Sequence, residues 1–315
     1  MYLGIDVSKS TLDCCLISDG IFFERQFKNN RAGFEQLKSW LDKNGATNAL
    51  HCCCEATGKY YESVAEYLSK YYRMSVENPR KIKGFGTAVL QRSKTDRQDA
   101  KTIAQYCKAL EPRPWQKPTE AQTKLRELTR YQHRLKRQKA AEQTKLQTAP
   151  AYLLPLIQST ITHLQQQIKA VQNQLNQFHK DNPDYKIQKE RLKTITGIGE
   201  AAANSLLSVL TQTDRFKTAA QFVAYLGLDP KENQSGTSLK GRPRISKLGN
   251  THLRTTLFIP AMHAYRSSTF AKYVSRLQKN GKRPKVIIVA LMRKLAVIAF
   301  TLLKNGQDFQ VERYK

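Results

Sequence analysis

The sequence predicts an α/β domain at the N-terminus, followed by a longer and mainly α-helical part. Short strand-like runs alternate with amphipathic helical patterns over residues 1–112, an order typical of a layered α/β domain. Between Ile157 and Phe178 an apolar residue recurs at spacings of four and three, and apolar helical patterns dominate from Arg191 onward. At 315 residues the chain has room for two or three domains.

The first domain, residues 1–112, is expected to contain three strands that form two hairpins, and then alternating strands and helices. The expected elements, in order, are strands Tyr2–Val7, Leu12–Ser18 and Ile21–Phe27, helix Arg31–Asn44, strand Asn48–Cys54, a helix through Tyr60, Val64 and Leu68, strand Met74–Glu77 and a helix beginning near Asp96. Asp19-Gly20 marks the second hairpin turn. The strand at Asn48–Cys54 is apolar on both faces, as expected for a central strand covered by helices.

Beyond a proline-rich connector at 111–118, residues 119–190 are predicted to be a basic helical and coiled-coil segment. Thr119–Thr148 forms a basic helical pattern that includes Arg130, Arg134 and Arg137, and Pro150 and Pro155 interrupt it. The apolar seam that follows extends over three heptads, which indicates a coiled coil or a long helical hairpin, within one chain or between chains. Residues 191–305 are expected to form a separate helical domain, with apolar helices at Phe216–Leu228, Thr251–Arg266 and Lys285–Leu303, and residues 306–315 a polar tail.

The charge is strongly positive and unevenly distributed. The formal net charge is +28, of which residues 1–110 contribute +5 (17 Lys and Arg against 12 Asp and Glu) and the remainder +23 (36 against 13). This excess favours a nucleic-acid partner over an anionic membrane, because the basic residues are spread over two long regions.

Neither secretion nor a membrane span is predicted. Met1 leads directly into Tyr-Leu-Gly-Ile-Asp without a basic or apolar leader, so no signal peptide is expected. The most apolar stretch, Val286–Leu303, is interrupted by Arg293-Lys294. The six cysteines have no metal-binding spacing and are expected to be buried apolar residues of a cytosolic chain.

Four carboxylates stand out in a chain that is poor in acids. Asp96 and Asp99 lie three residues apart at the start of a helix, where they are neighbours on its surface. One explanation for this repelling pair is a hard divalent cation; the other is that Asp96 caps the helix and Asp99 favours its positive end. Asp6, at the centre of the first strand, and Glu55, at the end of the fourth, can converge with the pair, because open α/β sheets form sites at the carboxyl ends of strands. Ribonuclease-H-like nucleases hold two metal ions in this way.

The second half carries two candidate phosphate-binding segments. Gly197 and Gly199 lie in Thr-Gly-Ile-Gly, which resembles a helix-hairpin-helix turn whose amides contact phosphate; a tight turn between packed helices explains the motif equally well. Residues 234–250 have few large apolar residues and are expected to form a loop that holds phosphates through four basic residues, Lys240, Arg242, Arg244 and Lys247. Ser235 beside Gly236 could serve as a nucleophile, although a plain turn serine is the simpler explanation.

Taken in order, these motifs resemble the DEDD transposases, the insertion-sequence-110 family of bacterial mobile elements. The matching pieces are Gly4-Ile5-Asp6-Val7-Ser8-Lys9, Glu55-Ala56-Thr57-Gly58-Lys59-Tyr60, Lys94-Thr95-Asp96 with Asp99-Ala100, Thr196-Gly197-Ile198-Gly199, Gln234-Ser235-Gly236, and Ser246-Lys247 with Gly249. Together they extend over nearly the whole chain. Thr196 departs from the family, which often has proline there.

The resemblance implies a RuvC-like N-terminal domain whose metal-binding tetrad is Asp6, Glu55, Asp96 and Asp99, with Mg²⁺ as the cofactor and Mn²⁺ as a substitute. It implies a C-terminal transposase domain in which Ser235 is the nucleophile. It further implies donor and target DNA as substrates, a guide (bridge) RNA as partner, a homo-oligomer from dimer to tetramer, and work at the bacterial nucleoid. Two other functions remain open: a metal-dependent, structure-selective nuclease that uses water, and a non-catalytic nucleic-acid-binding protein.

Overall fold

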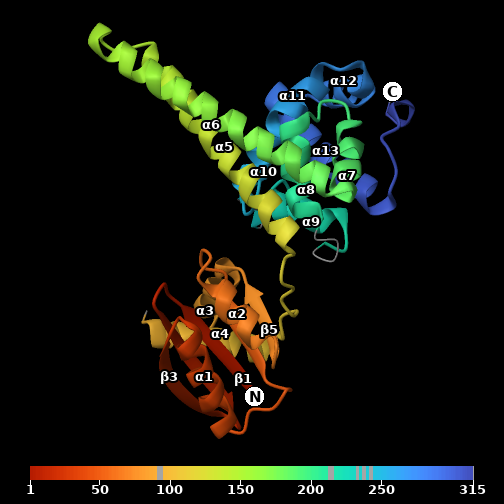
Figure 1. Cartoon of the computed structure of the whole chain (residues 1–315). Coiled ribbons are helices and arrows are strands. Elements are labelled where there is room, and N and C mark those ends of the chain that lie inside the picture. Colours follow the sequence, from red (N-terminus) through yellow and green to blue (C-terminus); the bar gives the residue numbers. More distant parts are fainter. Residues whose placement is uncertain (91–94, 212–215, 232–233, 236–238, 241–243, 315) are drawn as a thin grey trace. The chain divides into compact units, whose positions relative to one another are not determined.

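The computed structural model describes residues 1–90, 95–211, 216–231, 234–235, 239–240 and 244–314 (Figure 1). The chain divides into two compact units, Met1–Lys117 and Pro118–Lys315. The first is a mixed α/β unit and the second consists mostly of helices.

A five-stranded sheet with the order β3-β2-β1-β4-β5 organises the first unit. Its strands are β1 (Tyr2–Val7), β2 (Thr11–Ser18), β3 (Ile21–Lys28), β4 (His51–Glu55) and β5 (Arg73–Glu77). β1, β2 and β3 form the two predicted antiparallel hairpins, while β4 and β5 pair in parallel with β1 and with each other. Residues of β1 alternate between the two faces of the sheet, so Leu3, Ile5 and Val7 face one layer and Gly4 and Asp6 the other.

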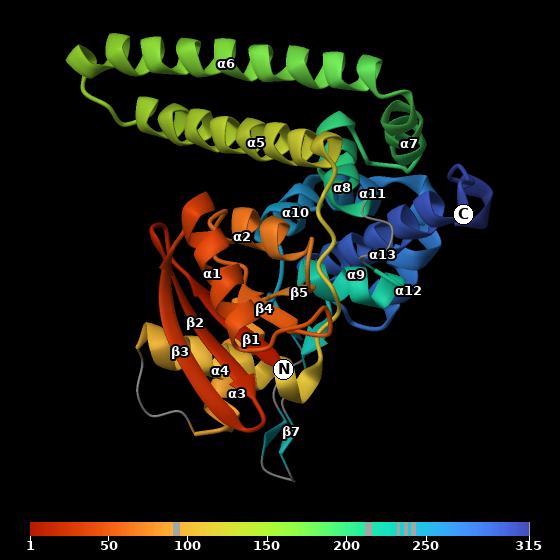
Figure 2. The ribbon, with the colours of Figure 1, turned by 60° about the horizontal axis from the view of Figure 1, so that its bottom comes forward.

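Helices cover both faces of this sheet (Figures 1 and 2). α1 (Arg31–Lys43) and α2 (Tyr61–Leu68) pack on the face that carries Leu3 and Ile5. α4 (Asp96–Leu110) packs on the opposite face, beside α3 (Pro79–Ala88). α3 was not among the predicted elements; Asn78 caps this helix, and Pro79 occupies its first turn. All six cysteines are free and buried, as predicted.

A long helical hairpin begins the second unit. α5 (Glu120–Leu146) starts at a capping box formed by Thr119 and Gln122, and α6 (Leu154–Asp181) returns beside it (Figure 2). Five residues of the predicted apolar seam are buried: Ile161, Leu164, Val171, Leu175 and Phe178. Leu164, Val171, Leu175 and Phe178 share one core with Leu125 and Leu135 of α5, so the hairpin packs within the chain. Pro155 does not interrupt a helix but lies in the first turn of α6, where its missing N–H costs nothing.

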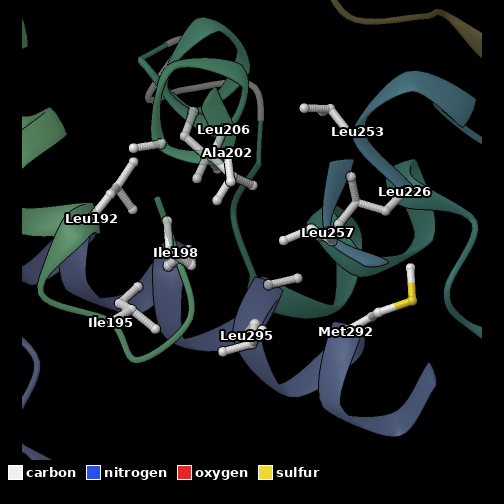
Figure 3. Packing of buried hydrophobic residues seen from close by; sticks show 14 of the residues in the cluster. Leu192, Ile195, Ile198, Ala202, Leu206, Leu226, Leu253, Leu257, Met292 and Leu295 are labelled. Carbon is white, nitrogen blue, oxygen red and sulfur yellow. The ribbon is translucent and has the colours of Figure 1, made fainter. Parts of the chain in front are cut away.

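The remaining helices form a single core (Figure 3). They are α7 (Pro183–Lys193), α8 (Glu200–Leu210), α9 (Ala219–Leu226), α10 (Thr251–Thr256), α11 (Phe258–Arg266), α12 (Ala271–Lys279) and α13 (Pro284–Asn305). The prediction of one helix over Thr251–Arg266 is wrong, because the chain forms two helices that divide at Leu257. Pro260 explains the division: it lacks an N–H and its ring clashes with the carbonyl four residues earlier.

α13 is long and apolar enough, by length and composition alone, to cross a membrane. Its residues Ile287, Leu291 and Leu295 are fully buried in the core of the second unit. Core helices of soluble proteins satisfy the same length and composition test, so α13 by itself gives little reason to infer a membrane span.

Candidate functional site

The backbone of the sheet brings Asp6 and Glu55 together. The parallel register that pairs Ile5 with Cys54 places Asp6 next to Glu55 at the carboxyl ends of β1 and β4. The antiparallel register on the other side pairs Asp6 directly with Asp13 of β2. Directly paired residues of neighbouring strands point to the same face, so Asp6 and Asp13 are side by side on the face that α4 covers.

α4 places its N-terminus at this same end of the sheet. A Cβ atom on Gly4 would lie 2.2 Å from the carbonyl oxygen of Ala100 and 2.3 Å from the amide nitrogen of Ala104, so the helix backbone touches β1 here. At the far end of the helix, the hydroxyl of Tyr2 donates to Glu111 Oε1 at 3.0 Å. The helix therefore runs antiparallel to β1.

Measured from this contact, the distance to Asp6 along β1 is nearly equal to the distance to Asp96 along α4. Asp6 lies two residues beyond Gly4, or roughly 6.6 Å along the strand. Asp96 lies four residues before Ala100, or about 6 Å along the helix axis. Asp96 is therefore level with Asp6, and Asp99 lies about 4.5 Å from Asp96 along the helix axis, toward Ala100.

The start of α4 corrects one interpretation of Asp96. Thr95 caps the helix, since its side chain accepts a hydrogen bond from the amide of Gln98 at 3.2 Å. Asp96 is the first helical residue, and both aspartates lie in the first turn. Their charges favour the positive end of the helix, but the capping role proposed for Asp96 is wrong.

The electrostatics reflect this gathering of acids. The pKa of Asp6 is raised to about 6, first by burial and then by the negative charges of Asp96, Asp99 and Glu55, in that order. Asp13 contributes in the same direction. As their side chains stand, no three His, Cys, Asp or Glu residues within the described parts of the chain are grouped closely enough to hold one cation.

Two acids at this end of the sheet were missed by the sequence analysis. Asp13 is 5% exposed and accepts hydrogen bonds from Gln26 Nε2 at 3.0 and 3.2 Å. Glu77 pairs with Glu55 in the β4–β5 register and forms an ion pair with Lys81 at 2.9 Å. Asp13 could have been noticed in the sequence, because it interrupts the apolar run of β2.

In the second unit, Ser235 lies on a β-hairpin arm rather than in the predicted open loop. β6 (Pro230–Lys231) pairs with β9 (Arg244–Ile245), and β7 (Gln234–Ser235) pairs with β8 (Leu239–Lys240) further out. Lys240 and Arg244 belong to these strands, and Lys247 follows them. Arg242 and Gly236 lie outside the described residues.

A hydrogen-bonded clasp closes the base of this arm. Ser246 donates its amide to the carbonyl of Asp229 at 2.9 Å and its hydroxyl to Asp229 Oδ1 at 2.6 Å. The amide of Lys247 donates to the carbonyl of Gly227 at 3.1 Å. A side chain on Gly249 would meet the carbonyl oxygen of Tyr225 at 2.3 Å, so the two ends of the arm lie in direct backbone contact. The clasp thus holds the base of the arm together.

We expect Ser246→Ala to destabilise the protein by about 1.5–3 kcal/mol, since it removes a hydrogen bond to a carboxylate. Urea denaturation measures this change in the free energy of unfolding. Ser69→Ala is the matched control, because the Ser69 hydroxyl donates to the neutral, exposed carbonyl of Glu66 at 3.0 Å. Equal losses of unfolding free energy in the two variants would show that the Ser246–Asp229 hydrogen bond stabilises the protein no more than an ordinary exposed hydrogen bond does.

The structure accounts for Gly197 by packing. Its φ is +93°, and a Cβ atom there would lie 2.5 Å from the carbonyl oxygen of Pro260 on α11. Gly199 is different: it precedes α8 at a φ of −90°, with open space where a side chain would be. The glycine turn therefore serves helix packing at Gly197 and leaves the N-terminus of α8 accessible at Gly199.

Arg130, Arg134 and Arg137 of α5 are all exposed, at spacings of four and three that place them along one side of the helix. The guanidinium of Arg134 lies 4.8 Å from the ring centroid of Tyr131. Next to this row, His133 packs edge-on against His252 of α10, with ring centroids 4.3 Å apart. The row is a basic surface that a polyanion can reach.

Comparison with known proteins assigns the chain to a family. A sequence profile described as Transposase matches residues 3–150, and one described as Transposase IS116/IS110/IS902 family matches residues 189–275. The pilin gene-inverting protein of Moraxella lacunata is 33% identical over 312 residues, which cover 98% of this chain and 97% of the relative. Its counterpart in Moraxella bovis is 32% identical over the same coverage.

Relatives from insertion sequences match about half of the chain. The uncharacterized 43.6 kDa protein of insertion element IS110 from Streptomyces coelicolor is 26% identical over 159 residues, which cover 50% of this chain and 38% of that protein. The resemblance inferred from the motifs is thereby confirmed. The chain belongs to the IS116/IS110/IS902 family of transposases and is a DNA transposase or recombinase.

Proposed function

We propose that this recombinase exchanges DNA strands under the direction of a guide RNA, through a covalent link between Ser235 and a DNA phosphate. Divalent cations held by Asp6, Glu55, Asp96 and Asp99 assist the chemistry. The observation that carries the proposal is the arrival of these four carboxylates at one end of one sheet face, where burial and the charges of the other three together raise the pKa of Asp6 to about 6. A bound cation would offset the electrostatic repulsion between these carboxylates, which explains why they lie so close together.

The sheet order supports a RuvC-like domain. β3-β2-β1-β4-β5, with an acid on the central strand β1 and a second acid at the end of β4, is the arrangement expected of ribonuclease-H-like nucleases. The carboxylate oxygens fit Mg²⁺, which prefers hard oxygen ligands, and Mn²⁺ as a substitute. Such ions, when bound, stabilise the negative charge that develops on the attacking and leaving oxygens of a phosphodiester. Rotation of carboxylate side chains would be needed to close the ligand set.

In the strand-exchange step, the Ser235 hydroxyl oxygen attacks the phosphorus and releases its proton to solvent. The bond to one deoxyribose oxygen breaks, and that oxygen takes up a proton to leave as a free hydroxyl. The resulting phosphoserine diester keeps the bond energy, so a deoxyribose hydroxyl of another strand can displace Ser235 and rejoin the DNA. Lys240, Arg242 and Arg244 would hold the flanking phosphates without reading sequence. Sequence choice would come from pairing between the guide RNA and the DNA.

The guide RNA and partner subunits are assigned to the helical hairpin. The row of Arg130, Arg134 and Arg137 offers phosphate contacts, and partner subunits would pack on the faces of the hairpin that its own buried seam leaves exposed. We propose a homo-oligomer, from dimer to tetramer, that works in the bacterial cytoplasm at the nucleoid.

The type of rearrangement has two candidates. Both full-length relatives are named as proteins that invert a pilin gene, which favours site-specific inversion of a DNA segment. The insertion-sequence relatives favour transposition, but they match only about half of the chain. The same strand-exchange chemistry serves either outcome.

Trapping the DNA–protein adduct tests the central step. The purified protein, with its co-purifying RNA and Mg²⁺, is incubated with labelled donor DNA and denatured. We expect labelled DNA on the protein, and a phosphodiester on the Ser235 peptide by mass spectrometry. Cleaved DNA that never carries protein would overturn the covalent mechanism in favour of a water-using nuclease.

A further inference from the structure

A groove of about 770 Å³ lies along α4, and none of the four carboxylates is among the residues that line it. Ile17, Gly20 and Phe22 of the β2–β3 hairpin form one wall, and Phe85, Val89 and Leu90 at the end of α3 form the other. Five residues of α4 also line the groove, and four of them, Gln98, Lys101, Gln105 and Lys108, are polar or basic. Their spacings of three, four and three place them on one helix face.

Phe22 provides a flat apolar surface in this groove. It lies on the edge strand β3, its side chain points to the α4 face, and it remains 37% exposed. The Lys101 ammonium lies 4.2 Å from its ring centroid, which fixes the ring beside a positive charge. Val89 and Leu90 extend the apolar surface, with exposures of 50% and 77%.

The charges that line the groove indicate which kind of molecule binds in it. Lys101 and Lys108 are about 10 Å apart along the helix axis, and none of the described residues that line the groove is acidic. A second copy of this chain, with its net charge of +28, is a poor match for two lysines. An aromatic ring among lysines and amide side chains is instead the combination that binds single-stranded nucleic acid, by base stacking and phosphate contacts.

We propose that this surface, the α4 groove, binds a single-stranded segment of nucleic acid. A base stacks against Phe22, and Lys101 and Lys108 neutralise phosphates of the same strand. The groove starts at Gln98, one residue before Asp99, so a strand bound there extends toward the carboxylate end of α4. Its role presupposes the strand exchange proposed above, but its occupancy can be measured without any cleavage.

Photocrosslinking locates the bound strand. Full-length protein is irradiated with short 5-iodouracil oligonucleotides of matched sequence, one RNA and one DNA, and crosslinked peptides are identified by mass spectrometry. We expect a crosslink at Phe22 with at least one of them, and the stronger one identifies the strand as RNA or DNA. Absence of a Phe22 crosslink from both oligonucleotides would overturn the assignment, as would equally effective competition by duplex DNA.

Two adjacent phenylalanines allow a matched comparison. Phe22→Ala should weaken binding of the crosslinking oligonucleotide by roughly 5- to 100-fold, the usual loss for one stacked base. Phe23 is also 37% exposed on the same strand but faces the α1 side of the sheet, so Phe23→Ala should change binding less than twofold. Phe22→Leu removes the aromatic ring but keeps the apolar packing, so it takes the place of the alanine variant if that variant unfolds. Equal effects of Phe22→Ala and Phe23→Ala would contradict the stacking role.

Salt dependence tests the lysines. Each neutralised phosphate of a single strand contributes about 0.7 to the slope of log affinity against log salt. Replacing both Lys101 and Lys108 by Gln should therefore reduce the slope by about 1.4. Lys70→Gln, an exposed lysine beyond α2, should leave it unchanged. An unchanged slope in the double variant would contradict the phosphate contacts, whether or not Ser235 proves to be the nucleophile.

Discussion

Ser235→Ala should lose strand cleavage, adduct formation and recombination by roughly 10⁴-fold or more, the scale of removing a catalytic nucleophile. The reason is chemical: alanine has no oxygen that can replace the leaving deoxyribose oxygen on phosphorus. Binding of RNA and DNA should persist. Denaturing gels of labelled donor DNA measure cleavage and adduct, and gel-shift titration measures binding.

Asp6→Asn is the companion variant. Asparagine preserves the shape of the side chain but removes the charge that a cation needs, so cleavage should again fall to background. Because this substitution also removes one negative charge from a crowded acidic group, we expect the variant to be at least as stable toward urea as the wild type.

The two variants together separate the three functions left open by the sequence. Strand exchange through serine requires that both abolish cleavage. A water-using nuclease requires that only Asp6→Asn does so, with Ser235→Ala still cutting. Normal function in both variants would mean that the protein acts by binding nucleic acid alone.

The strands of the first unit and their order along the chain could be predicted because local patterns determine them. Alternation along β1, the Asp19-Gly20 turn and the doubly apolar β4 place three antiparallel strands before a strand–helix alternation. That Asp6 and Glu55 would be neighbours followed from strand order, and Asp96 and Asp99 from helix spacing. The relation of α4 to β1 did not follow, because it depends on the contact of Gly4 with Ala100 and Ala104, two segments far apart in the sequence.

The serine arm was less predictable for a physical reason. Its strands are two residues long, too short for any alternation to be read. Its base depends on the contact of Ser246 with Asp229 and on the fit of Gly249 against Tyr225, which are non-local. The same limit applies to Asp13, an acid in an apolar strand whose significance appears only when β2 is set beside β1.

Gly4→Ala should be among the most damaging substitutions of a small residue outside the proposed chemistry. Its new methyl group would meet the backbone of α4 at 2.2 and 2.3 Å, and backbone atoms on both sides leave no flexible side chain to give way. α4 would have to move away from β1, which separates Asp96 and Asp99 from Asp6. We expect a loss of about 3 kcal/mol or more in the free energy of unfolding, together with loss of DNA cleavage.

Gly84→Ala is the matched control, because Gly84 lies within α3 with open space around its Cβ position. Alanine is the better helix former there, so the control should be stabilised by up to about 1 kcal/mol and keep full cleavage activity. Urea denaturation of both variants and cleavage assays at a temperature where Gly4→Ala is still folded separate a displaced helix from a simple loss of fold. If Gly4→Ala remained folded and cleaved DNA at the wild-type rate, the contact between β1 and α4 would not be what holds the four carboxylates in one place.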